Sequence, residues 1–75
     1  MTFKQKVLTA LKERGIRVLR TEGYGNVKVL ACFIDKADNV KFEALRYELE
    51  RELESALTLS QKHGMNIVIV ESNEE

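Results

Sequence analysis

Apolar side chains recur every three or four residues near the start of the chain: Phe3, Val7, Leu8 and Leu11. This spacing is typical of one face of a helix. Thr2 and Gln5 match a capping box at its beginning. Gly15 can take the left-handed conformation that ends a helix. We therefore predict a helix over residues 3–14.

The following segment alternates apolar and polar residues and then becomes continuously apolar. Ile16 to Thr21 has the alternation of a half-buried edge strand. Val27 to Asp35 has the apolar content of a second strand, and Gly23 to Asn26 is a turn whose residues tolerate positive φ. Two strands joined by so short a turn form an antiparallel hairpin.

A second helical stripe follows Asp38 and Asn39, either of which can cap a helix. Its apolar residues are mostly three or four apart: Phe42, Leu45, Leu49, Leu53, Ala56 and Leu57. The other faces carry glutamates that we interpret as solvated, and Arg46 and Glu50 are spaced to pair weakly. His63-Gly64 is expected to end this helix, with Gly64 in the left-handed conformation.

The expected order is thus helix, strand, strand, helix, strand. A second helix of roughly 24 residues spans about 36 Å, so it can run back along the sheet. The last strand, Met65 to Val70, should then lie parallel to the second strand through a right-handed crossover. We predict a single α+β domain over residues 1–75: a two-layer αββαβ sandwich with a three-stranded mixed sheet and both helices on one face.

Two helices on one face leave the other face of the sheet uncovered. Two apolar sets alternate along the second strand, and Phe33 favours placing its own set in the core. The face without helices should then be lined by Leu30, Cys32, Ile34, Val68 and Val70. An apolar patch of this kind rarely stays wet. It predicts a docking or dimer surface, unless the first helix or the Gly23–Gly25 turn folds over it.

Charge is distributed unevenly although the formal net charge is zero. Residues 1–36 hold eight Lys/Arg and three Asp/Glu, whereas residues 37–75 hold four and nine. The halves can attract each other inside one fold, or the basic half can contact nucleic acid. The residues of this second alternative are Lys4, Lys6, Lys12, Arg14, Arg17 and Arg20. They lack the stacking aromatics and the Gly-x-x-Gly clamp that RNA-binding domains use.

The side chains that carry enzyme chemistry are scarce. His63 is the only histidine, and we place it at a helix end, where it interacts with carbonyl groups. Cys32 is the only cysteine, which excludes an internal disulfide and fits a buried, inert thiol in a reducing compartment. Asp35 and Asp38 flank a turn, and capping explains Asp38 without a cation. We therefore expect no catalysis, no cofactor and no bound metal.

The longest apolar run, Val29 to Ile34, is far shorter than the roughly 20 residues of a membrane helix. The first residues develop no apolar signal-peptide stretch. We expect a cytoplasmic protein without membrane insertion. The missing chemistry and the apolar sheet face together predict a non-catalytic protein-binding module, acting as a homodimer, a small adaptor or an inhibitor.

Two families with KH-like domains of the type II order resemble this chain. Val29-Leu30 and Phe33 to Lys36, followed by Val40 to Phe42, are similar to the strand-to-helix passage in the N-terminal domain of the ribosome maturation factor RimP. This resemblance implies an RNA- or ribosome-associated domain that binds the small ribosomal subunit. The second, barrel-like domain of that family is absent from these residues.

The second resemblance is to the cytoplasmic domain of cation diffusion facilitators. Leu19 to Thr21, with Gly25 and the following strand, is similar to its first hairpin. It implies a dimeric regulatory domain that often binds metal. The usual histidines of that family fall near Arg46 and Ile69 here, so the resemblance implies a domain without its metal ligands.

Overall fold

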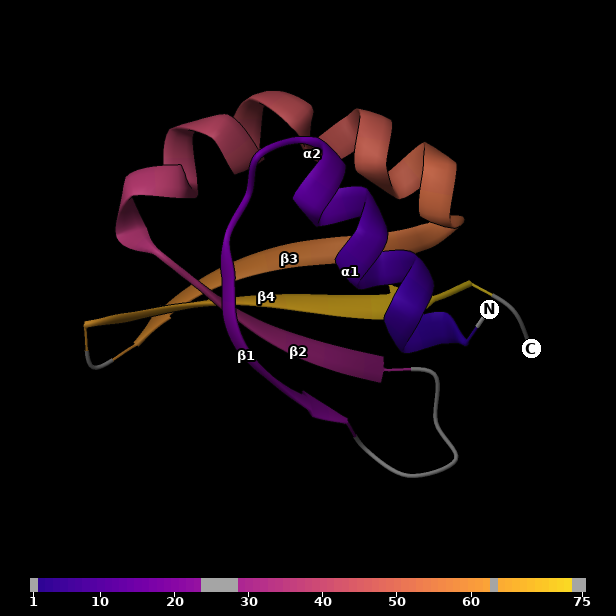
Figure 1. Cartoon of the computed structure of the whole chain (residues 1–75), viewed down its shortest axis with the longest axis horizontal. Coiled ribbons are helices and arrows are strands. Elements are labelled where there is room, and N and C mark those ends of the chain that lie inside the picture. The colour runs from indigo at the N-terminus through magenta and orange to yellow at the C-terminus, as the bar shows by residue number, and fades with distance from the viewer. Residues whose placement is uncertain (1, 24–28, 63, 74–75) are drawn as a thin grey trace.

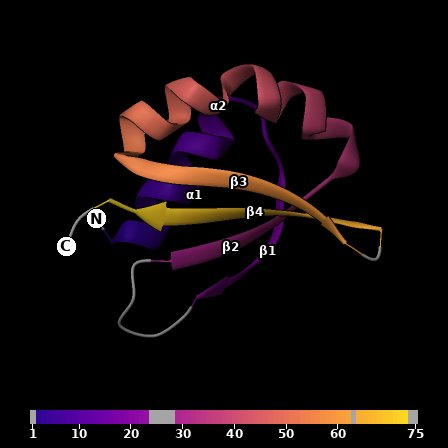
Figure 2. The same ribbon diagram turned by 180° about the vertical axis from the view of Figure 1, so that it is seen from behind.

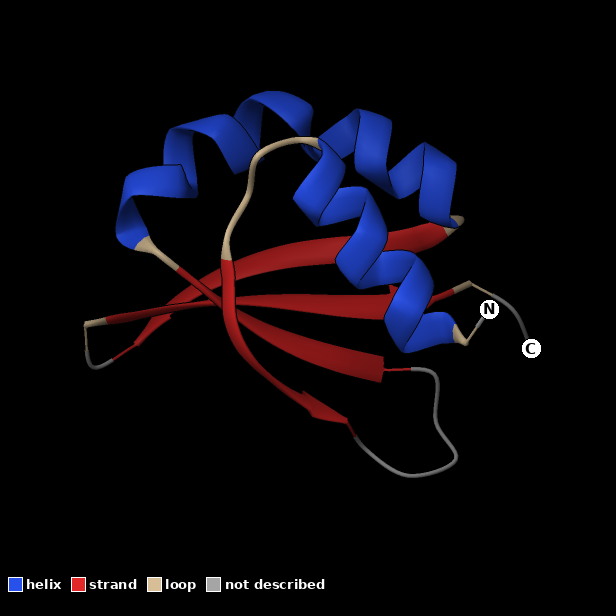
Figure 3. Ribbon diagram, viewed as in Figure 1, coloured by secondary structure: helices blue, strands red, loops and turns tan. Residues whose placement is uncertain are grey.

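The computed structural model describes residues 2–23, 29–62 and 64–73. These residues form two α-helices and a four-stranded sheet, and Figures 1 and 3 show the α-helices lying over the sheet. The elements are α1 (Phe3–Glu13), β1 (Val18–Gly23), β2 (Val29–Ile34), the 3₁₀ helix η1 (Lys36–Asp38), α2 (Asn39–Leu53), β3 (Ser55–Lys62) and β4 (Met65–Ser72). The strand order is β1-β2-β4-β3, and each neighbouring pair is antiparallel.

Helix α1 begins and ends where the local sequence predicts. The Gln5 amide donates to the Thr2 hydroxyl at 3.1 Å, and the Thr2 amide donates to the Gln5 side chain at 3.0 Å. At the other end Gly15 has φ +75°, and the Ile16 amide donates to the Leu11 carbonyl at 3.0 Å. This bond closes the last turn and brings Ile16 into the core beside Leu11.

Strands β1 and β2 form the predicted antiparallel hairpin, with Gly23 opposite Leu30. Strand β1 lies at the edge of the sheet, as its alternation predicts. It begins at Val18 rather than at Ile16, because Ile16 completes the cap of α1. The predicted turn at Tyr24 to Asn26 and the predicted strand start at Val27 lie outside the described residues.

The prediction of one long second helix is wrong. Helix α2 ends at Leu53, Glu54 turns the backbone with φ 50° and ψ 47°, and β3 follows. Ala56 and Leu57 therefore belong to a strand. Leu57 and Leu59 also fit the two-residue period of a strand. Eight residue pairs with β4 stabilise the strand conformation of this segment. Local helical spacing is a weak preference that such pairing between strands overrides.

This extra strand changes the topology. The predicted α+β class is confirmed, but the sheet has four strands instead of three and is antiparallel throughout rather than mixed. Strand β4 therefore runs antiparallel to β2, not parallel to it. Gly64, with φ +74°, lies just before β4 instead of ending a helix. His63, which we placed at the helix end, lies outside the described residues.

The two faces of the sheet are the reverse of those predicted. The residues expected on the face without helices are all buried in the core: Leu30, Cys32, Ile34, Val68 and Val70. They pack with Val7 and Leu11 of α1 and with Phe42 and Leu49 of α2. Both helices thus cover this face, and the prediction that it is an interface is wrong. Phe33 instead lies on the opposite face, where Arg20 stacks over its ring.

Ion pairs join the basic first half to the acidic second half. The Arg14 guanidinium in the cap of α1 lies 3.2 Å from the Glu48 carboxylate and 2.8 Å from that of Glu52, both on α2. Glu50 accepts from the Leu57 amide at 3.0 Å and lies 4.0 Å from Arg46, as predicted. These glutamates are therefore not merely solvated, as we interpreted them. The two Arg14 pairs link α1 to α2 and thereby join the basic half to the acidic half.

Candidate functional site

Half of the sheet residues face away from both helices, and we call their surface the open face. Directly paired residues of antiparallel strands share a face. Phe33 is paired with Arg20 on one side and with Ile67 on the other, and Ala31 is paired with Glu22 and Ile69. The open face consists of Arg20, Glu22, Val29, Ala31, Phe33, Ala56, Thr58, Ser60, Met65, Ile67, Ile69 and Glu71. Figure 2 views the sheet from this side, with the strands in front of α1.

The middle of the open face is apolar. The two central strands, β2 and β4, supply its apolar side chains: Val29, Ala31, Phe33, Met65, Ile67 and Ile69. Ala31 and Phe33 are buried by their neighbours, at 2% and 9% exposed, and Met65 is 45% exposed. Val29, Ile67 and Ile69 are half-buried. Edge strand β3 contributes Thr58 and Ser60, and edge strand β1 contributes charged residues. An apolar strip thus runs between polar rims.

The charges on the rim have both signs. The Arg20 guanidinium lies 4.2 Å from the centroid of the Phe33 ring and 3.4 Å from the Glu22 carboxylate. Glu71 lies opposite Val29, toward the same end of the strands as Glu22. Arg20 lies two residue pairs from Glu22, toward the other end of the strands. The face is therefore acidic toward one end and carries a stacked cation toward the other.

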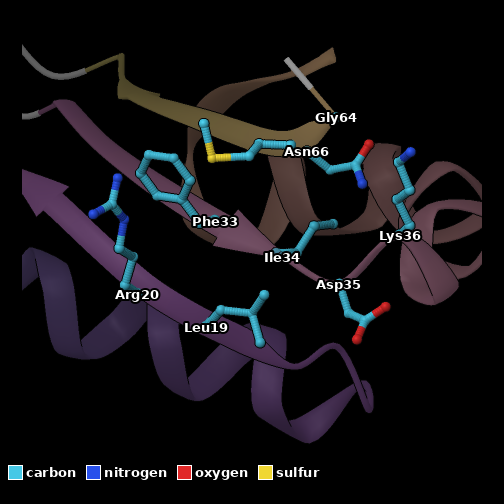
Figure 4. Close-up of a pocket in the computed structure, with 9 residues that line it drawn as sticks. Leu19, Arg20, Phe33, Ile34, Asp35, Lys36, Gly64 and Asn66 are labelled. Carbon is cyan, nitrogen blue, oxygen red and sulfur yellow. The ribbon is translucent and has the colours of Figure 1, made fainter. Parts of the chain in front are cut away.

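A cavity of about 400 Å³ lies at this second end of the sheet (Figure 4). Leu19, Phe33 and Met65 contribute apolar side chains to its lining. Leu19 is 59% exposed, because the pairing of β1 with β2 shifts register between Val18 and Arg20. Asn66, also in the lining, is buried and accepts a hydrogen bond from the Asn39 amide group at 3.0 Å. The buried end of the cavity is therefore fixed to the start of α2.

The six basic residues of the nucleic-acid alternative do not form one patch. Lys4 and Lys6 are two residues apart on α1, which turns them about 200° from each other. Arg14 is held by glutamates of α2, and Arg20 stacks on the open face. Lys12 and Arg17 line a separate hollow beside α1. The structure thus distributes these cations over several sides of the molecule.

Cys32 is fully buried, and burial raises the pKa of its thiol to about 11. A thiol in this environment is inert as a nucleophile near neutral pH. Asp35 accepts from the Ala37 amide at 2.9 Å, and Asp38 accepts from the Arg17 amide at 2.9 Å. Asp38 is the N-cap residue of α2, but its side chain makes no cap bond to that helix.

Within the described ranges, no group of three or more His, Cys, Asp or Glu residues is arranged to hold a metal ion. No helix in the same part of the chain is long and apolar enough to cross a bilayer.

Sequence patterns did not identify the most exposed members of the open face and of the cavity. Leu19 follows Val18, and Met65 begins the largely apolar segment from Met65 to Val70, so nothing in their spacing separates them from core positions. The consecutive pair Val18-Leu19 on an edge strand is the one signal of the register shift that exposes Leu19. The stack of Arg20 on Phe33 depends on the pairing of β1 with β2, which the sequence does not specify locally.

Comparison with known proteins adds no relative. No protein-family model, no curated protein and no solved structure matches the chain. The geometry of the open face and of the cavity is therefore the basis on which a function can be argued.

Proposed function

We propose that the chain is a non-catalytic protein-binding module whose open face docks a second copy of the same chain. The observation that carries this proposal is the apolar strip on β2 and β4, flanked by polar rims. Protein interfaces have this anatomy, with an apolar centre from which water is excluded and a polar periphery. Covering the strip removes apolar surface from water, which is the main driving force of association.

The charges on the rim support a second copy as the occupant. Two copies can pack face to face about a two-fold axis perpendicular to the strands, as aligned sheets do. Arg20 of one copy then lies over the position of Glu22 of the other, and the reverse pair forms as well. The end of the open face that carries Glu71 in one copy then faces the end that carries Arg20 in the other copy. Because the formal net charge is zero, two copies do not repel each other at long range.

The size of the face indicates a weak dimer. Strands of six to eight residues at about 3.3 Å per residue, spaced about 4.8 Å apart, cover roughly 400–500 Å² per copy. The dimer would bury roughly 800–1,000 Å², less than the 1,200–2,000 Å² of a typical stable complex. We therefore expect a reversible dimer with a dissociation constant in the micromolar range.

Sedimentation equilibrium from about 10 µM to about 1 mM tests this proposal. The mass should rise from that of one chain to that of two. Ile69→Lys places an ammonium group in the middle of the apolar strip and should keep the protein monomeric. Val40→Lys is the matched control, because Val40 is 83% exposed on α2 and lies away from the sheet. A wild-type monomer at the highest concentration, or equal dissociation by both variants, would contradict the proposal.

One observation favours the RNA- or ribosome-associated alternative. Arg20 stacked on Phe33 over an antiparallel sheet resembles the platforms on which RNA-binding domains stack bases. The dispersed basic residues argue against it, since backbone contacts supply most of the affinity for nucleic acid. Binding to structured RNA that weakens steeply with salt would support this alternative. An absence of RNA binding at low salt would exclude the RNA- or ribosome-associated alternative and leave the homodimer as the proposed function. The resemblance to the cytoplasmic domains of cation transporters also implies a dimer.

A further inference from the structure

We propose that the cavity at the Met65 end of the sheet binds a small molecule with an apolar body and one anionic group. The lining residues come from one copy, so the cavity exists without a second copy. Arg20, Phe33 and Met65 also belong to the open face, so a docked second copy and the ligand compete for them. The cavity volume of about 400 Å³ lies within the range of small-molecule sites. Such sites combine mainly apolar walls with a few polar groups that fix the orientation of the ligand.

The apolar side chains that line the cavity are the reason for proposing a ligand with an apolar body. Leu19 and Met65 are two large apolar side chains that remain substantially exposed, and both line this cavity. Phe33 lies between them in the lining, with Arg20 over its ring. A flat ring or short chain entering the cavity would cover Leu19 and Met65 without displacing a core residue. The gain is the removal of this apolar surface from water.

The charged residues that line the cavity are the reason for proposing an anionic group on the ligand. Lys36 is exposed and forms no ion pair with any residue that the structure describes. The neighbouring Asp35 carboxylate accepts from the Ala37 amide and is thereby turned toward η1. Figure 4 shows the head groups of Asp35 and Lys36 pointing apart. Arg20 already shares its charge with Glu22 at 3.4 Å. Lys36 is therefore the cation that remains for an anionic group of the ligand.

A matched pair of fluorescent probes tests both halves of the inference. Anilinonaphthalene sulfonate has an apolar aromatic body and one anionic group, and phenylnaphthylamine has nearly the same body without the charge. Both should bind, and the sulfonate should bind about fivefold more tightly, the range of one exposed ion pair. Amide resonances of Leu19, Gly64 and Asn66 should shift during the titration.

Variants assign the two contributions. Met65→Ala should weaken both probes by roughly fivefold, because it removes an apolar wall. Lys36→Glu should weaken only the sulfonate and abolish its advantage over the neutral probe. Tyr47→Ala is the control, since Tyr47 is 75% exposed on α2 and lies outside the cavity. Urea midpoints of the variants show whether each remains folded.

Two results would overturn the inference. One is binding that is unchanged in both Met65→Ala and Lys36→Glu. The other is binding lost in the monomeric Ile69→Lys variant and in wild-type protein diluted to the monomer, since the probe would then lie between two copies. Retained binding in those monomers supports the cavity even if the proposed dimer fails. A wild-type monomer that binds the probe would contradict only the dimer.

Discussion

Substitution of two consecutive residues on β4 by lysine should have opposite consequences for stability. Val68 is fully buried against both helices, whereas Ile69 is half-buried on the open face. The strand alternates, so the same charged side chain points into the core at one position and toward water at the next. We predict that Val68→Lys unfolds the domain and that Ile69→Lys leaves it folded.

The difference can be estimated from burial. Val68→Lys loses about 2 kcal/mol of apolar burial. A buried ammonium has its pKa lowered by up to about 3–5 pH units, equivalent to roughly 4–7 kcal/mol. The total of about 6–9 kcal/mol is comparable to the about 4–11 kcal/mol expected for a domain of 75 residues. Ile69→Lys should cost only about 1 kcal/mol, because its ammonium group reaches water.

Circular dichroism and urea titration at neutral pH measure both variants. We expect an unfolded spectrum for Val68→Lys and a cooperative transition, slightly lowered, for Ile69→Lys. An unfolded Ile69→Lys beside a folded Val68→Lys would mean that the helices cover the other face. Two folded variants with similar midpoints would refute the two-layer packing itself.

Three further predictions concern the core, the buried thiol and the end of α2. Leu49→Ala should cost about 2–5 kcal/mol in a urea titration, because Leu49 is fully buried, whereas Glu43→Ala on the exposed side should stay within about 0.5 kcal/mol. The Cys32 pKa of about 11 lies above its ordinary value of 9.0, so its contribution to stability is present below pH 9 and is lost as pH rises toward 11; Cys32→Val should remove this part of the pH dependence of the urea midpoint. Glu54→Gly should raise the free energy of unfolding by about 0.5–1 kcal/mol, because Glu54 has φ 50°; a midpoint that falls would show that the Glu54 side chain stabilises this turn.

Elements with local signals were predictable from the sequence. The capping box at Thr2, the apolar stripe and Gly15 all lie within α1 or at its ends, and the structure confirms each of them. The β1–β2 hairpin is likewise local. These features need no information about distant residues, because their hydrogen bonds join positions close together in the chain.

The second half of the fold was not predictable in the same way. Leu53, Ala56 and Leu57 fit a helix, while Leu57 and Leu59 fit a strand. The ladder with β4 decides between them, and no glycine marks the change of direction at Glu54. Two compatible periods in one segment leave the outcome to the pairing of that segment with β4.

The candidate site was misplaced for a related reason. Both alternating sets on β2 are apolar, so the pattern alone does not say which of them faces the helices. Because Phe33 is large, we predicted that it and the residues alternating with it face the core. Arg20 of the neighbouring strand instead covers the Phe33 ring, which reduces the cost of placing this ring on the face away from the helices. Only the register of β1 against β2 reveals this contact. The apolar sheet face exists, but it consists of the other set of residues.

The most direct test of the central claim is an isotope-filtered nuclear Overhauser experiment on a mixture of labelled and unlabelled protein. It detects only contacts between two copies. At concentrations where the dimer is populated, intermolecular signals should arise from the methyl groups of Val29, Ile67 and Ile69 on the open face. Intermolecular signals confined to Val40 and Tyr47 on α2, or none at the highest soluble concentration, would contradict the claim that the open face docks a second copy.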